Sequence, residues 1–170
     1  MAKFYKYYHT SADTNLAPPA TEWIDGYINS QTGELVPPSA VTKEKTSDFI
    51  PITGGSTYTY SHAGGFPTNA AETAAWRSME VYSSNKTYLG RRGIGDTTAP
   101  LTESLPSNAA YVRLSCSTYG VVDGYMFNTG TSALPYTDYY SWHEIAIYAR
   151  DSNSWTTATA YEYNGGWQST

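Results

Sequence analysis

Side chains capable of catalysis do not form a recognised catalytic motif in this sequence. His143 and Glu144 begin like the zinc-protease pattern His-Glu-x-x-His, but Ile147 stands where the second histidine is needed. Ser61 lacks a nucleophile elbow, because Thr59 occupies the position of the first glycine. We therefore predict that the protein is not an enzyme.

Carboxylates and metal ligands are equally scattered. Glycoside hydrolysis needs two carboxylates held about 5–10 Å apart across the scissile bond, and the sequence offers only Glu22, Asp25 and Glu80 as candidates. A polysaccharide-cleaving enzyme therefore ranks behind two binding functions. The three histidines have no ligand-like spacing, so we predict no cofactor. A structural calcium at Asp25-Gly26 or Asp123-Gly124 stays open, although Asp-Gly pairs are first of all turn sequences.

Composition narrows the class of partner. The net charge is −5 and the ten basic residues form no run, which argues against nucleic acid because its binding depends on neutralising phosphates. No apolar stretch approaches the ~20 residues that a membrane-spanning helix needs, and the first ten residues lack the apolar core of a signal peptide. We expect neither membrane insertion nor secretion by the usual route.

Tyrosine-rich alternating segments separated by glycine, proline and asparagine indicate short strands and turns. The sequence contains 17 Tyr, 14 Gly and 9 Pro residues, and Tyr suits the half-buried face of a sheet. In 110–116, Ala110, Val112, Leu114 and Cys116 alternate onto one face, which predicts a buried strand with an unreactive thiol. Few windows favour a helix, and the best candidate is 69–75. The pattern predicts an all-β, jelly-roll-like β-sandwich. The strands that support it are predicted over 23–29, 49–52, 57–61, 76–82, 87–91, 110–116, 124–127 and 142–148. Hairpin turns are predicted at 31–33, after the first strand, and at 83–86, between 76–82 and 87–91, with a turn-rich loop over 93–108.

Three parts are expected along the chain. Residues 1–14 form an aromatic N-terminal arm, 15–142 form the β-sandwich, and 143–170 form a small β-hairpin or meander. The last part is too small to be stable alone. We therefore predict that Trp155 and Trp167 serve assembly, by docking on the sandwich or on a neighbouring chain.

The outer faces of two strands supply the candidate ligand site. Alternation places Trp76, Glu80 and Tyr82 on one side of 76–82, and Tyr111 and Arg113 on the side of their strand that points away from the core. If these strands share a sheet, aromatic rings lie beside planar hydrogen-bonding groups, as a sugar ring requires. The competing interpretation is cross-strand packing with a plain ion pair. The glycine-rich loop near Asp123 and Tyr125 adds recognition candidates. The predicted saccharide-binding set is Trp76, Glu80, Tyr82, Tyr111, Arg113, Asp123 and Tyr125.

Several segments together resemble a known family. They are Gly26-Tyr-Ile28, Thr46-Ser-Asp-Phe-Ile-Pro-Ile52, Gly55-Ser-Thr-Tyr58, Val81-Tyr82 with Asn85-Lys86, and Ala109-Ala-Tyr-Val-Arg-Leu-Ser115. Over roughly 15–128 the chain is similar to the carbohydrate-binding-type β-sandwich module of tail and baseplate (distal-tail) proteins of phages that infect Gram-positive bacteria. The pattern Trp155…Tyr161-Glu-Tyr163…Gly165-Gly-Trp167 resembles short C-terminal repeats of phage structural proteins. Unlike an inserted module, this chain carries its own N-terminal arm.

The resemblance implies a lectin-like module that recognises host cell-surface saccharide, or one that only decorates the virion. The first hypothesis is therefore non-catalytic binding of bacterial cell-surface polysaccharide for host adsorption. The second is a structural decoration or baseplate accessory that acts through other virion proteins, with a homo-oligomer possible. Both place the protein in the virion (tail or baseplate), assembled in the host cytoplasm.

Overall fold

The computed structural model describes residues 14–68, 76–95 and 97–139 with their side chains. It also describes the backbone of three strands beyond residue 144. The chain divides into two compact units, the larger being Ala12–Tyr139. The predicted helix over 69–75 and residues 1–13 of the predicted arm lie outside the described residues. In the parts that are described, no helix has the length and apolar character needed to cross a bilayer.

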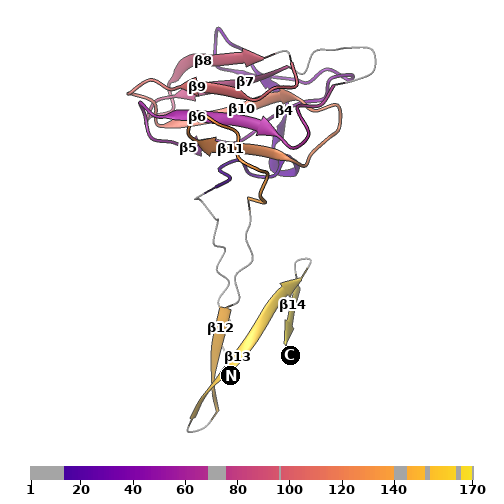
Figure 1. Cartoon of the computed structure of the whole chain (residues 1–170), viewed down its shortest axis with the longest axis vertical. Coiled ribbons are helices and arrows are strands. Elements are labelled where there is room, and N and C mark those ends of the chain that lie inside the picture. The colour runs from indigo at the N-terminus through magenta and orange to yellow at the C-terminus, as the bar shows by residue number, and fades with distance from the viewer. Residues whose placement is uncertain are drawn as a thin grey trace. The chain divides into compact units, whose positions relative to one another are not determined.

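The larger unit is an all-β sandwich, as predicted (Figure 1). One sheet has the strand order β1-β4-β10-β7-β8, with β5 also paired to β10, and the other has the order β11-β6-β9. Their pairings are antiparallel. The chain crosses between the sheets from β6 to β7, from β8 to β9, from β9 to β10 and from β10 to β11, as in jelly rolls. The strands are β1 (Ile24–Asp25), β4 (Glu44–Thr46), β5 (Ile50–Pro51), β6 (Thr57–His62), β7 (Arg77–Tyr82), β8 (Tyr88–Gly95), β9 (Leu101–Ser104), β10 (Tyr111–Ser117) and β11 (Tyr125–Thr129).

The core lies between these two sheets. Strand β10 contributes Val112, Leu114 and Cys116, each with no exposed surface, which confirms the alternation expected for that strand. The facing sheet contributes aromatic side chains, of which Tyr60 and Phe127 are fully buried. Burial raises the pKa of the Cys116 thiol to about 12. The predicted small, unreactive core cysteine is therefore confirmed as a buried residue.

One strand lies in a segment predicted to be loop. Strand β8 extends to Gly95, and β9 pairs with β6 through Tyr60 opposite Leu101. Strand β9 places Leu101 in the core, and across the β6–β9 pair the hydroxyls of Thr59 and Thr102 lie 2.9 Å apart. A strand of four residues with one buried leucine is too short to show the alternating pattern of a strand, and its segment is rich in Gly, Thr and Pro.

A sharp bend at Gly26 divides the first predicted strand in two. Before the bend β1 pairs with β4, and after it β2 (Tyr27–Ile28) pairs with β3 (Leu35–Val36). Gly26 has a φ of 128°, and a Cβ there would lie 2.3 Å from the carbonyl oxygen of Val36. Glycine is therefore required for the chain to leave the sheet and form the predicted hairpin. A single 3-10 turn, η1 (Ala20–Glu22), precedes it.

The smaller unit contains a three-stranded antiparallel meander, which confirms the predicted C-terminal β appendage. Its strands are β12 (Ile145–Asp151), β13 (Ser154–Tyr163) and β14 (Gly166–Ser169). In the backbone register Trp155 is opposite Arg150, and Trp167 is opposite Glu162. The assembly role predicted for the two tryptophans stays a prediction.

Candidate binding pocket

The β2–β3 hairpin covers part of the outer face of the larger sheet. Three sheet side chains hold it: Arg91 Nη2 donates to the Ile28 carbonyl (2.9 Å), Tyr82 Oη to that of Gly33 (3.4 Å), and Tyr88 Oη lies 3.3 Å from that of Ser30. Gly33 has a φ of 75°, and a Cβ there would lie 2.6 Å from the Tyr88 ring. The hairpin can therefore approach the sheet this closely only with glycine at its turn.

Beneath the hairpin, Glu80 organises a buried polar network. Its carboxylate has no exposed surface and accepts hydrogen bonds from Arg91 Nε, Ser78 Oγ and Tyr88 Oη, each at 2.7 Å. A buried carboxylate is tolerated only when it is paired and hydrogen-bonded in this way. Burial and the bond to Glu80 raise the pKa of the Tyr88 hydroxyl well above its ordinary value. The network fixes Arg91 in position.

A bulge in β8 brings Arg91 opposite Glu80. The pairing of Tyr82 with Tyr88 would place Gly90 opposite Glu80 in an unbroken antiparallel ladder. The register shifts between Val81 and Tyr82, however, and Gly90 has a φ of 111°. The extra residue moves Arg91 across from Glu80.

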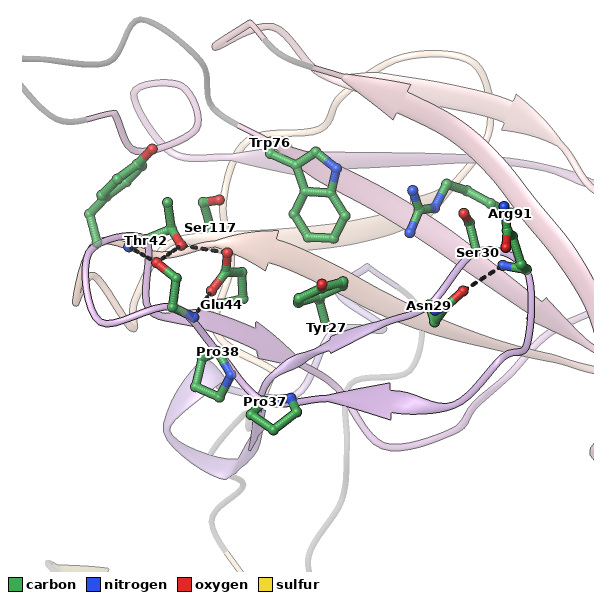
Figure 2. A pocket seen from close by; sticks show the side chains of 13 residues that line it. Tyr27, Asn29, Ser30, Pro37, Pro38, Thr42, Glu44, Trp76, Arg91 and Ser117 are labelled. Atoms are coloured by element: carbon green, nitrogen blue, oxygen red, sulfur yellow. Dashed lines mark hydrogen bonds between the residues drawn. The ribbon is translucent and has the colours of Figure 1, made fainter.

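The hairpin, the loop after it and the sheet line an open pocket of about 750 Å³ (Figure 2). Trp76 and Tyr27 form its aromatic wall, with ring centroids 5.9 Å apart and an edge-to-face angle of 78°. The Arg91 guanidinium lies 5.3 Å from the Trp76 ring. The lining residues are Tyr27, Asn29, Ser30, Gln31, Pro37, Pro38, Ser39, Thr42, Glu44, Trp76, Arg91, Ser117 and Tyr119.

An acidic group lies at the other side of the aromatic pair. Figure 2 shows Trp76 and Tyr27 between Arg91 on one side and Glu44 on the other. The Glu44 carboxylate accepts hydrogen bonds from the backbone N–H of Ser39 (2.7 Å) and from the Thr42 hydroxyl. The pocket thus offers ring faces and edges, fixed N–H donors and a carboxylate acceptor.

Strands β7 and β10 do share a sheet, which was the condition set for the predicted ligand face. Arg113 is opposite Glu80, and Tyr111 is opposite Tyr82. The expectation of an open face needs correction, because the hairpin leaves Glu80 with no exposed surface and Tyr82 with 3%. Among these five residues, Trp76 lines the pocket and Glu80 supports it through Arg91.

The other three residues gather around Phe49 instead. The Phe49 ring meets the Tyr82 ring at 4.9 Å and the Tyr111 ring at 5.9 Å, both edge-to-face. Arg113 donates from Nε to the Ser47 carbonyl (2.8 Å), and its guanidinium lies 5.2 Å from the Phe49 ring. Tyr82, Tyr111 and Arg113 therefore form an aromatic–cation cluster separate from the pocket lining.

The loop candidates lie elsewhere. Tyr125 is 3% exposed, packs in the core with its ring centroid 5.1 Å from that of Trp23, and donates its hydroxyl to the Val121 carbonyl (3.2 Å). Burial raises the pKa of Tyr125. Asp123 is exposed, and its carbonyl oxygen lies 2.7 Å from Nε2 of His62. Neither residue lines the 750 Å³ pocket.

Sequence reasoning did not include Tyr27, Glu44 and Arg91 in the site. Tyr27 lies in a segment noted for its family resemblance, and Arg91 ends the strand predicted to pair with 76–82. Those patterns placed both residues in strands, but the hairpin packing and the β8 bulge decide that they meet Trp76. Nothing in the Lys-Glu-Lys context of Glu44 signals a pocket.

No protein-family model matches this chain, and a search of curated proteins finds no match either. Among the described residues, no group of three or more His, Cys, Asp or Glu side chains is arranged to hold a metal ion.

Proposed function

We propose that this protein is a non-catalytic, lectin-like module that binds bacterial cell-surface saccharide in the Trp76 pocket. The observation that carries the proposal is the aromatic pair Trp76–Tyr27 placed between the anchored Arg91 guanidinium and the Glu44 carboxylate. The C–H face of a sugar packs on an aromatic ring, while its hydroxyls pair with planar donors and acceptors at the edges.

The size and rigidity of the pocket support the same function. A volume of about 750 Å³ lies within the range of roughly 300–1,000 Å³ that is typical of small-molecule sites. Arg91 is held at Nε and Nη2 before any ligand arrives, so little side-chain freedom is lost on binding. The setting of this binding, a phage tail or baseplate that adsorbs to a host cell, rests on the family resemblance of 15–128.

The test is binding of the full chain to a glycan array and to wall polysaccharides purified from a panel of Gram-positive bacteria. A ligand at Trp76 should shift or quench the intrinsic tryptophan fluorescence. We expect Trp76→Ala to weaken binding at least tenfold while the melting temperature changes little, because Trp76 is only partly buried. Tyr136→Ala, an exposed aromatic outside the pocket (41% exposed), is the matched control and should bind normally. Equal binding by both variants would contradict the assignment.

The C-terminal meander favours a second function, that of a structural decoration or baseplate accessory. Within the described chain, β12 and β14 each pair on one side only, and open sheet edges are sites for pairing with other chains. A small sheet of this kind is stabilised when its apolar face packs on another surface. In this role Trp155 and Trp167 contact other virion proteins or a second copy. Light scattering on the full chain tests it: a stable oligomer that dissociates in the Trp155→Ala/Trp167→Ala variant is expected, and a monomer in both would contradict it.

A further inference from the structure

Two of the thirteen residues that line the pocket are charged, Arg91 and Glu44. The two lysines that flank Glu44 do not belong to the lining. Lys45 instead bonds to Asp25, with 2.7 Å between Nζ and Oδ1. Among the described residues, the charges in the pocket lining are therefore those of Arg91 and Glu44, and Arg91 has Glu80 directly behind it.

Behind Arg91 lies Glu80, fully buried, with its Oε1 at 2.7 Å from Arg91 Nε. At this separation, with the carboxylate out of water, the two charges largely cancel toward a third group. Arg91 thus presents oriented N–H groups with little net positive charge. Among the described residues, the hydrogen-bond donors to the Glu44 carboxylate are neutral, the Ser39 N–H and the Thr42 hydroxyl. Summed over Arg91, Glu80 and Glu44, the formal charge of the site is −1.

The Arg91 side chain is also held in place, so it cannot reorient toward a bound anion. Its Nη2 donates to the Ile28 carbonyl at 2.9 Å, and its guanidinium lies against the Trp76 ring. Within the described residues, Arg91 Nη1 has no hydrogen-bond acceptor and faces the pocket as an available donor. One guanidinium nitrogen suits a neutral hydroxyl or carbonyl oxygen, whereas recognition of a carboxylate or phosphate typically uses a bidentate, uncompensated arginine.

We infer that the ligand class of this pocket is a neutral, hydroxyl-rich sugar, and that the pocket rejects saccharides carrying carboxylate or phosphate. In this arrangement Arg91 Nη1 donates to a sugar oxygen, the Glu44 carboxylate accepts from a sugar hydroxyl, and the ring packs on Trp76. The net charge of −5 on the whole chain acts in the same direction, because it repels polyanions before contact. This inference rests on the proposed function and specifies its ligand.

The experiment uses the full chain and matched glycan pairs that differ in one charge. The array carries glucose- and glucuronate-terminated glycans, galactose and galacturonate counterparts, and a polyglycerol-phosphate polymer as a phosphate probe. We expect binding to neutral members only, with at least tenfold discrimination against each acidic counterpart. Affinity for the neutral glycan should change less than twofold between 50 and 500 mM NaCl, because no net ion pairing forms.

Charge variants distinguish this mechanism from simple shape selection. Glu44→Gln removes one negative charge from the pocket lining, and we expect it to reduce the discrimination against acidic glycans at least threefold. Glu80→Gln leaves an amide that can still accept from Arg91 Nε, and it should have a comparable effect on discrimination. Because Glu80 is buried, its variant can fail to fold. Glu44→Gln by itself therefore tests the electrostatic explanation. Ser117→Ala is the control, because it changes the pocket lining without changing its charge.

The outcomes separate the two levels of the proposal. Preference of the wild-type protein for the acidic members, lost in Trp76→Ala, would overturn the neutral-ligand inference and leave saccharide binding intact. Unchanged discrimination in Glu44→Gln would overturn the electrostatic explanation. Failure to bind any glycan on the array would reject the proposed function and this inference together.

Discussion

The two faces of the β7–β10 strand pair are both buried, but by opposite means. On the inner face Met79, Val81 and Leu114 have no exposed surface and pack against the aromatic side chains of the other sheet. On the outer face Ser78 and Glu80 are just as buried, yet they lie in a hydrogen-bonded network with Arg91. An apolar face is stabilised by area removed from water, whereas a polar face is tolerated only when each group has its partner.

This contrast explains why the outer face can hold a pocket. Apolar packing is non-directional and fills space, so a gap in it is unfavourable. A hydrogen-bonded network is directional, and it can leave a guanidinium fixed beside open space when its partners lie behind it. Arg91 is anchored from behind by Glu80 and from the side by Ile28, which leaves Trp76 and the space before it available to a ligand.

The largest effect is expected on the inner face. Leu114→Ala removes a fully buried side chain and should lower the free energy of unfolding by about 2–5 kcal/mol, since it loses transfer free energy and leaves a cavity. Ser115→Ala, its neighbour on the outer face, removes a 2.7 Å hydroxyl pair with Thr46 and should lower it by about 1 kcal/mol. Urea unfolding measures both. Equal losses would mean that the two faces do not differ as described.

The next effect is on the buried ion pair. Glu80→Ala leaves Arg91, whose side chain is 19% exposed, without its carboxylate, and should lower the free energy of unfolding by about 3 kcal/mol. Asp25→Ala breaks the surface pair with Lys45, in which Asp25 is 73% exposed, and should lower it by less than about 1 kcal/mol. Chemical denaturation of the two variants compares them. A loss in Glu80→Ala no greater than that in Asp25→Ala would show that the network carries little stability.

A smaller effect is expected at the hairpin that closes the outer face. Gly33→Ala introduces a left-handed backbone strain at φ 75° and a Cβ 2.6 Å from the Tyr88 ring, which together should lower the free energy of unfolding by about 1–3 kcal/mol. Gly64→Ala is the matched control, because its φ is 78° but a Cβ there meets nothing within 4 Å. Hydrogen exchange of the 29–34 amides should accelerate in the first variant only. If Gly33→Ala and Gly64→Ala lost the same stability and exchanged at the same rate, the loss would come from backbone strain alone and not from the contact with Tyr88.

Sequence periodicity predicted the features that depend on residues close together in the sequence. The alternation in 76–82 and 110–116 gave both strands their correct faces, because side chains in a strand alternate wherever it packs. The burial of Cys116 followed from the same pattern, whereas the pairing of the two strands was only a condition that the structure meets. The hairpin after Gly26 was predicted from its turn residues.

The pocket was not predictable in this way, since it depends on contacts between distant parts of the chain. The position of the hairpin over the sheet is set by Gly33 against Tyr88, which are 55 positions apart. Arg91 reaches Glu80 only because of the bulge at Gly90, and register counting without it gives the wrong partner. Glu44 joins the pocket through a loop whose local sequence carries no periodic signal.

The smallest effect concerns the pH dependence contributed by the inner face. Cys116 has a pKa raised to about 12 by burial, from a reference value of 9.0. A pKa raised on folding gives stability that is complete below the unfolded value and is lost as the pH rises toward the folded one. Between pH 9 and 10 the unfolded thiol ionises while the folded thiol stays protonated, so the free energy of unfolding should fall by about 1 kcal/mol from this group. Cys116→Ala should remove this fall in the free energy of unfolding with rising pH. Val112→Ala, a core truncation on the same strand and face, should keep it. Urea unfolding at both pH values measures the slopes, and an unchanged slope in Cys116→Ala would mean that the thiol is not held protonated by the core.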